Sequence, residues 1–202
     1  MIFIIITTSI LNKHGVKNDF HRKHRYIECI QQLLKLIEND SSIKPIIVEN
    51  NGIRKTYLDD FNCDVCYTNN NIIHYPHKGV NELLDIKEVI NRYNIQDNDV
   101  IIKLTGRYKL LDLSFINLIK NNNYDAFVKF FNVCTKKYMY DDCVLGLFAI
   151  KCKYMKVFNY KCIKSPECEF ADYIRQNINK LMEIKELNIE CCFADNLRLL
   201  IV

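Results

Sequence analysis

The sequence begins with MIFIIITT, residues 1–8, an unbroken run of apolar and mostly β-branched side chains that ends in two threonines. Such a run is typical of a strand that is covered by helices on both faces of a parallel sheet. Apolar residues then recur at helical spacing over residues 22–38, and a second short apolar run follows at residues 44–48. The order strand, helix, strand predicts the first βαβ unit of such a sheet.

We find no internal repeat and no low-complexity linker in the sequence. Because strands and helices keep alternating, we expect a single Rossmann-like α/β/α sandwich over residues 1–202, with a mostly parallel central sheet. After the first unit the pattern predicts a short helix at 56–61, a strand at 64–68, a helix at 79–93, a strand at 99–104, a helix at 114–120, strands at 124–131 and 144–151, a helix at 167–185 and a strand at 187–194.

The composition argues against a nucleic-acid-binding protein and against a membrane-spanning one. The 28 basic and 24 acidic residues give a net charge of +4, which is too small and too scattered to predict a nucleic-acid partner. No segment approaches the roughly 20 apolar residues that a membrane span needs. The sequence has ten cysteines and no recognisable secretory signal, so we expect reduced, mostly buried thiols and a cytoplasmic protein.

Ligands of open α/β sheets bind beyond the carboxyl ends of the strands. Four polar segments follow predicted strands, and together they offer hydroxyls, amides, a carboxylate and two cations. This mixture suits a nucleotide, whose base and ribose need hydrogen bonds and whose phosphates need positive charge. The basic stretch His21–Arg25 is interpreted as a solvated helix face, with a phosphate or an acidic partner as the alternative. The four polar segments are Thr7–Ser9, Glu49–Gly52, Thr68–Asn70 and Lys103–Tyr108.

Four motifs in a fixed order carry a resemblance to a known family. They are IIVENNG (46–52), HKGVNELLDIKEVI (77–90), VIIKLTGRY (100–108) and GLFAIKCKYM (146–155). Their order resembles the GT-A nucleotide-diphospho-sugar glycosyltransferases, including small enzymes encoded by large DNA viruses, over about residues 1–185. The resemblance implies a GT-A-like fold that transfers a sugar from a UDP- or GDP-sugar to a glycan, lipid or protein acceptor, in the host cytoplasm if the protein is viral.

The resemblance also implies roles for individual residues. The nucleotide-binding part is expected over about residues 1–110 and the acceptor side over about 111–202. A bare charge inside an apolar strand costs several kcal/mol, so Lys103 is expected to be ion-paired or functional. The resemblance places Glu49 at the nucleoside, Lys78 and Gly79 near the ribose or sugar, and Lys103 and Arg107 at the diphosphate. The full set expected to bind the nucleotide sugar is Thr7, Thr8, Ser9, Glu49, Asn50, Asn51, Lys78, Gly79, Lys103, Thr105, Gly106 and Arg107.

One departure from the family concerns its metal. Most GT-A enzymes end the fourth strand in a D-x-D motif that holds manganese or magnesium, but this chain has Lys103–Arg107 there. The literal D-x-D, Asp97–Asp99, precedes the strand and is interpreted as a turn, and Asp141-Asp142 is a neighbouring pair on a loop. Three alternatives stay open: a divalent metal, manganese or magnesium, binds without the motif; fixed cations replace the metal electrostatically; or the site has lost its activity.

An inverting transferase, which we slightly favour, needs a carboxylate to deprotonate the acceptor hydroxyl. Carboxylates gather where Ser165 and Pro166 predict the start of a helix. Glu169 is the first candidate for this base and Asp172 the second. The helix dipole alone also explains carboxylates at this place, and a retaining mechanism needs no such base.

Two other functions compete with sugar transfer. Sugar-phosphate nucleotidyltransferases share a similar sheet, but they carry a Gly-rich loop with a basic residue after the first strand, where residues 7–15 have one glycine. The third hypothesis is a nucleotide-sugar-binding scaffold without catalytic activity. The absence of a G-x-G-x-x-G after any predicted strand argues against a Rossmann dehydrogenase.

Overall fold

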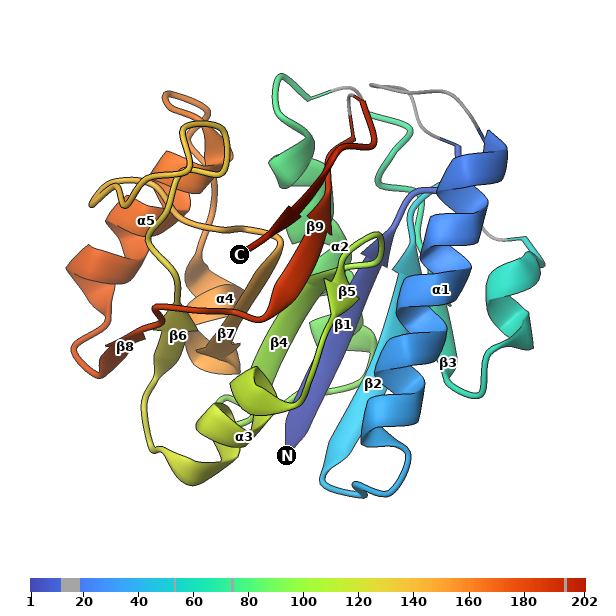
Figure 1. Ribbon diagram of the computed structural model, residues 1–202, viewed down its shortest axis with the longest axis horizontal. Coiled ribbons are helices and arrows are strands. Elements are labelled where there is room, and N and C mark those ends of the chain that lie inside the picture. Colours follow the sequence, from blue (N-terminus) through green and yellow to red (C-terminus); the bar gives the residue numbers. More distant parts are fainter. Residues whose placement is uncertain (12–18, 53, 74, 195) are drawn as a thin grey trace.

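The computed structural model describes residues 1–11, 19–52, 54–73, 75–194 and 196–202. Its centre is strand β1 (Ile2–Thr8), whose seven residues are all buried. It lies between β2 (Ile43–Glu49) and β4 (Val100–Thr105) and runs parallel to both (Figure 1). The prediction that MIFIIITT forms a doubly covered central strand is therefore confirmed.

The central sheet has seven strands in the order β3-β2-β1-β4-β7-β6-β8. Strand β7 runs antiparallel to β4 and β6, and the other pairings are parallel. The expected α/β fold with a mostly parallel sheet is thus confirmed. The remaining strands of this sheet are β3 (Asp64–Tyr67), β6 (Ala126–Val128), β7 (Leu147–Lys151) and β8 (Leu181–Glu183).

Helices cover both faces of the sheet, because alternate residues of β1 enter two different cores. Ile2, Ile4 and Ile6 pack with α1 (Asp19–Ile37) and α3 (Ser114–Asn121). Phe3 and Ile5 pack with the other three helices on the opposite face (Figure 1). Those helices are α2 (Lys78–Arg92), α4 (Cys152–Val157) and α5 (Pro166–Asn177).

A second, three-stranded sheet lies beside α1 in the order β10-β9-β5 (Figure 1). It combines β5 (Lys109–Leu110), β9 (Ile189–Cys192) and β10 (Leu199–Ile201). Arg25 of α1 binds it through Glu190, with 2.7 Å between Nη2 and Oε1. The terminal strand expected at 187–194 is present as β9, and the short 3-10 helix η1 (Tyr57–Asp60) matches the helix expected at 56–61.

The helix expected over residues 167–185 is wrong in its second half. Helix α5 ends at Asn177, and residues 181–183 form β8, which pairs in parallel with β6. Ile178 and Leu181 continue the helical spacing by coincidence, and a three-residue strand is too short to show its own alternation. Residues 181–183 instead form a strand that pairs with β6, because the buried main-chain N–H and C=O groups of β6 need hydrogen-bond partners.

The described residues contain ten free thiols, six of them buried. No helix in the described part of the chain has the length and apolar character that crossing a membrane requires.

We predict that Gly146→Ala destabilises the fold. A Cβ atom built at Gly146 lies 1.9 Å from Cε2 of Tyr108, so the ring or the backbone must move. Overpacking of this kind costs about 1–3 kcal/mol, and urea denaturation measures it. The same substitution in a Tyr108→Ala background lacks the clash and should cost less, and an equal loss in both backgrounds would contradict the argument.

Candidate functional site

A cleft of about 440 Å³ opens at the carboxyl end of β4. Its walls come from the start of α2, the start of α5 and the two segments 132–134 and 142–146. A second hollow of about 300 Å³, over residues 75–79, shares Lys78, Gly79, Pro166 and Glu167 with it. Clefts of these sizes hold small ligands such as nucleotides.

Two helices start at this cleft. Gly79 of α2 lies against Pro166 of α5, and a Cβ atom at Gly79 would come within 2.7 Å of the Pro166 Cβ atom. The α5 start is capped by Ser165, whose Oγ accepts from the Cys168 N–H at 3.3 Å, whereas His77 makes no side-chain cap at α2. Free N–H groups and the helix dipole favour an anion at such starts.

Lys103 of β4 is the most deeply buried cation of the cleft, with 3% of its side chain exposed. Its Nζ lies 2.9 Å from Oε2 of Glu82 and 2.6 Å from Oγ1 of Thr105. Of the two roles expected for Lys103, the structure therefore shows the ion pair. Lys103 holds the pKa of Glu82 low although burial alone raises it. The sequence analysis did not identify Glu82 as a site residue, although it lies only one turn into α2, close to the predicted site residues Lys78 and Gly79.

Two further cations reach the cleft without a carboxylate partner among the residues that the structure describes. Arg107 is 7% exposed and donates from Nε to the Cys192 carbonyl at 3.3 Å. Lys78 is half-buried at the first position of α2. Burial lowers the pKa of Lys78 to about 8, and the nearby positive charge of Arg107 adds to this shift while Glu82 opposes it.

The ends of β1 and β2 form a closed hydrogen-bond network around Glu49, which is fully buried. Its carboxylate accepts from the Thr8 hydroxyl at 2.7 Å and from the Ile10 N–H at 3.1 Å. The Asn51 side-chain amide also donates to it. These bonds place Thr8, Glu49 and Asn51 together, as the strand-end argument predicts.

A second buried carboxylate, Asp85 of α2, ties together the loops after β2 and β3. It accepts from the Thr68 hydroxyl at 2.7 Å, from Asn70 at 2.8 Å and from Asn50 at 2.9 Å. Burial raises the pKa of Asp85 to about 7, although the three hydrogen bonds lower it. The sequence analysis includes this residue only within the motif at residues 77–90 and assigns it no role.

The structure brings together part of the predicted nucleotide-sugar set. Gly106 joins the β1 end to β4, because its N–H donates to the Thr7 carbonyl at 2.9 Å. Thr7, Thr8, Ser9, Glu49, Asn50 and Asn51 lie at the ends of β1 and β2 and do not line the 440 Å³ cleft itself. The predicted residues that line it are Lys78, Gly79, Lys103, Thr105 and Arg107.

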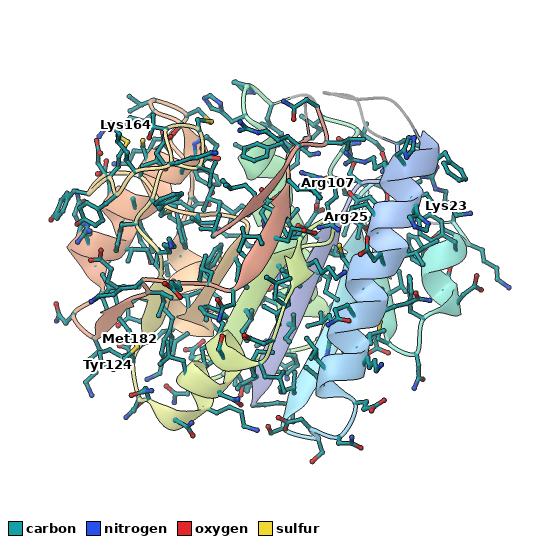
Figure 2. The ribbon with its side chains drawn as sticks, viewed as in Figure 1. Lys23, Arg25, Arg107, Tyr124, Lys164 and Met182 are labelled. Atoms are coloured by element: carbon teal, nitrogen blue, oxygen red, sulfur yellow. The ribbon has the colours of Figure 1, made fainter. Side chains whose placement is uncertain are left out.

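Glu169 and Asp172 are not brought to this cleft. Glu169 accepts from the backbone N–H groups of Lys161 at 2.6 Å and Lys164 at 3.0 Å, and these bonds lower its pKa although burial raises it. Asp172 pairs with Lys164 at 2.8 Å. Both line a separate hollow, and Lys164 lies well away from Arg107 in Figure 2. Because helix residues two apart face different sides, Glu167 lines the cleft instead.

Of the three described carboxylates that line the cleft, two already have partners and only Glu167 is left for a divalent metal. Glu82 is paired with Lys103, and Asp142 accepts from Asn132 at 2.6 Å. The Asp97–Asp99 turn precedes β4, and Asp97 pairs there with Lys156 at 2.6 Å. Among the described residues, no three His, Cys, Asp or Glu side chains gather into a group that could hold a metal.

No family model and no curated protein matches the sequence. Several solved structures share the fold. A protein described as a nucleotide-diphospho-sugar transferase, from Desulfovibrio desulfuricans G20, matches at a TM-score of 0.56 and 9% identity, over 91% of this chain and 79% of that one. A cytidylyltransferase from Leptospira borgpetersenii matches at 0.56 and 13%, over 91% and 75%. A197 from STIV matches at 0.50 and 10%, over 99% and 93%. At these identities the similarity shows the fold alone.

The raised pKa of Asp85 predicts a pH-dependent stability. The carboxyl ionises near 3.8 when unfolded and near 7 when folded, so the folded chain holds a proton that the unfolded chain has released. The free energy of unfolding should therefore fall as the pH rises from about 4 to about 7. Urea denaturation of wild type and Asp85→Asn across this range measures the difference. Parallel profiles for the two proteins would rule out this role of Asp85.

Proposed function

We propose that the protein transfers a sugar, of the hexosyl kind, from a nucleotide-diphosphate sugar to a hydroxyl group on a glycan, lipid or protein. The observation that carries this proposal is the cleft beyond β4. It combines Lys78 and Arg107, two helix starts and the carboxylate of Glu167 in a volume that suits a nucleotide sugar. The cations can neutralise the diphosphate, and the carboxylate can deprotonate the acceptor hydroxyl.

The donor occupies the part of the molecule built from about residues 1–110. Its nucleoside, of a UDP- or GDP-sugar, lies at the polar ends of β1 and β2, beside Glu49 and Asn51, and its diphosphate lies toward Arg107. The acceptor approaches from the side formed by about residues 111–202. The fold similarity to a nucleotide-diphospho-sugar transferase supports this arrangement.

In the proposed step Glu167 acts as the general base. Its carboxylate takes the proton of the acceptor hydroxyl, and the hydroxyl oxygen forms a bond to the anomeric carbon. The bond between that carbon and the diphosphate oxygen breaks, with inversion, and the electron pair leaves with the diphosphate. Lys78 and Arg107 stabilise the negative charge that develops there. Glu169 and Asp172 stay a second hypothesis for the base, which the same assay tests.

A second candidate function is nucleotidyl transfer to a sugar phosphate, supported by the fold similarity to a cytidylyltransferase. The two reactions differ in their product, because nucleotidyl transfer releases pyrophosphate from a nucleoside triphosphate. A binding scaffold without catalysis would bind the nucleotide sugar and release neither product. A cytoplasmic location and a viral origin stay predictions.

We expect purified protein to release a nucleoside diphosphate from one member of a panel of UDP-, GDP-, CDP- and TDP-sugars. Glu167→Gln should lower this turnover by about 100-fold or more while donor binding, followed by thermal shift, is retained. Glu169→Gln and Asp172→Asn are the matched controls, since they change the same chemistry on the same helix. Loss of turnover in Glu169→Gln with an active Glu167→Gln would assign the base to Glu169. Failure of every nucleotide sugar to bind would overturn the proposal.

A further inference from the structure

We propose that Arg22, Lys78 and Arg107 form a fixed cationic clamp for the diphosphate of the donor, in place of a divalent metal. This inference rests on the proposed function and deepens it. It assigns a role to Arg22, which belongs to the basic stretch interpreted from the sequence as a solvated helix face. The structure corrects that interpretation for Arg22, which is 2% exposed, while Lys23 and His24 are exposed as predicted.

Arg22 lies in the first turn of α1 and is held by two hydrogen bonds. Its Nε donates to the Ser9 carbonyl at 3.1 Å, and its Nη2 donates to the Tyr26 hydroxyl at 3.0 Å. The remaining nitrogen, Nη1, is buried and has no hydrogen-bond partner among the residues that the structure describes. A buried guanidinium nitrogen without a hydrogen-bond partner lowers the stability of the ligand-free protein.

Arg22 and Arg107 meet through Tyr26. The Tyr26 hydroxyl accepts from Arg22 and from the Ser9 N–H at 3.1 Å. The Tyr26 ring packs against Gly106, where an added Cβ atom would lie 3.0 Å from Cδ1. The Arg22 guanidinium is thus held at the end of β1 through Ser9, whereas Arg107 follows β4 and its guanidinium is held by the Cys192 carbonyl of β9. The ends of β1 and β4 are the place where the strand-end rule puts the phosphates of a nucleotide.

The charges around this point do not balance. Lys78 feels the positive charges of Arg107, Arg22 and Lys103, and the carboxylate that opposes them is Glu82. Glu82 is already paired with Lys103 at 2.9 Å. Among the described residues, no carboxylate forms an ion pair with Arg22, Lys78 or Arg107. Like charges held close together in a buried site destabilise the free protein and favour an anion that neutralises them.

A diphosphate fits this arrangement chemically. Guanidinium groups bind phosphate oxygens through paired N–H donors, and a lysine adds a point charge. The start of α2, where Lys78 lies, adds free N–H groups. In metal-dependent relatives a divalent cation supplies this positive charge. Here two of the three carboxylates that line the cleft already have partners, and no group of three ligating side chains is found among the described residues, so the clamp itself neutralises the leaving group.

The first test measures binding of inorganic pyrophosphate and of the nucleoside diphosphates UDP and GDP by titration calorimetry, with EDTA or with manganese. Wild-type protein should bind pyrophosphate and one nucleoside diphosphate in EDTA. Arg22→Gln and Arg107→Gln should each weaken binding by about tenfold or more. Arg92→Gln is the matched control, because Arg92 carries the same charge at the opposite end of α2, paired with Glu88 at 2.9 Å. It should bind as wild type does.

The second test separates a binding role from a structural one. Removing a cation from the crowded cluster relieves repulsion, so Lys78→Met should raise the melting temperature of the ligand-free protein while it reduces the shift that pyrophosphate produces. A purely structural lysine would lower the melting temperature when removed. A lower melting temperature together with unchanged pyrophosphate binding would overturn the role of Lys78 in the clamp.

The outcomes distinguish the clamp from the proposed function. Binding of nucleoside diphosphate that requires manganese would overturn the clamp and leave sugar transfer standing. Binding of pyrophosphate in EDTA, weakened in Arg22→Gln, without binding or turnover of any nucleotide sugar would support the clamp and overturn the proposed function. Absence of all binding, with and without manganese, would overturn both.

Discussion

Strand β1 is buried on both faces, and the rest of the structure depends on that constraint. Its main-chain groups pair with β2 on one side and β4 on the other, and its side chains need an apolar cover above and below. Polar side chains are therefore placed at the end of such a strand, where water or a hydrogen-bonding or charged partner can satisfy them. This is why carboxylates from a neighbouring helix, Asp85 and Glu82, meet the polar ends of the parallel strands.

The fold was predictable from the sequence where a segment has one dominant period. Strand β1 and helix α1 follow from continuous and 3.6-residue patterns, and their order alone implies parallel pairing. Strand β8 was not predictable, because it is short and its pairing partner β6 is remote in the chain. Local periodicity contains no information about such a partner.

The site was predictable only in outline. The strand-end rule predicts a position near the end of β4 for Lys103 and Arg107 from the order of strands alone, and both residues line the cleft there. The burial of Arg22 depends on how α1 sits against the end of β1, and the choice between Glu167 and Glu169 depends on the rotation of α5. The sequence spacing of residues within a basic or acidic cluster determines neither the burial of Arg22 nor the choice between Glu167 and Glu169. Lys103 and Arg107 also differ in their partners: Glu82 neutralises Lys103, whereas Arg107 has no carboxylate partner among the described residues.

The small sheet has a consequence for how the chain folds as it is made. Strand β5 at residues 109–110 pairs with β9 at residues 189–192, and Val202 is buried against the same core. A ribosome therefore releases the whole of β1, β2 and β4 well before the segment that covers this face of them. Contacts so distant in sequence form slowly, and a nascent chain with an uncovered apolar face is open to aggregation or to chaperone binding. Strand β9 thus determines when this apolar face becomes covered.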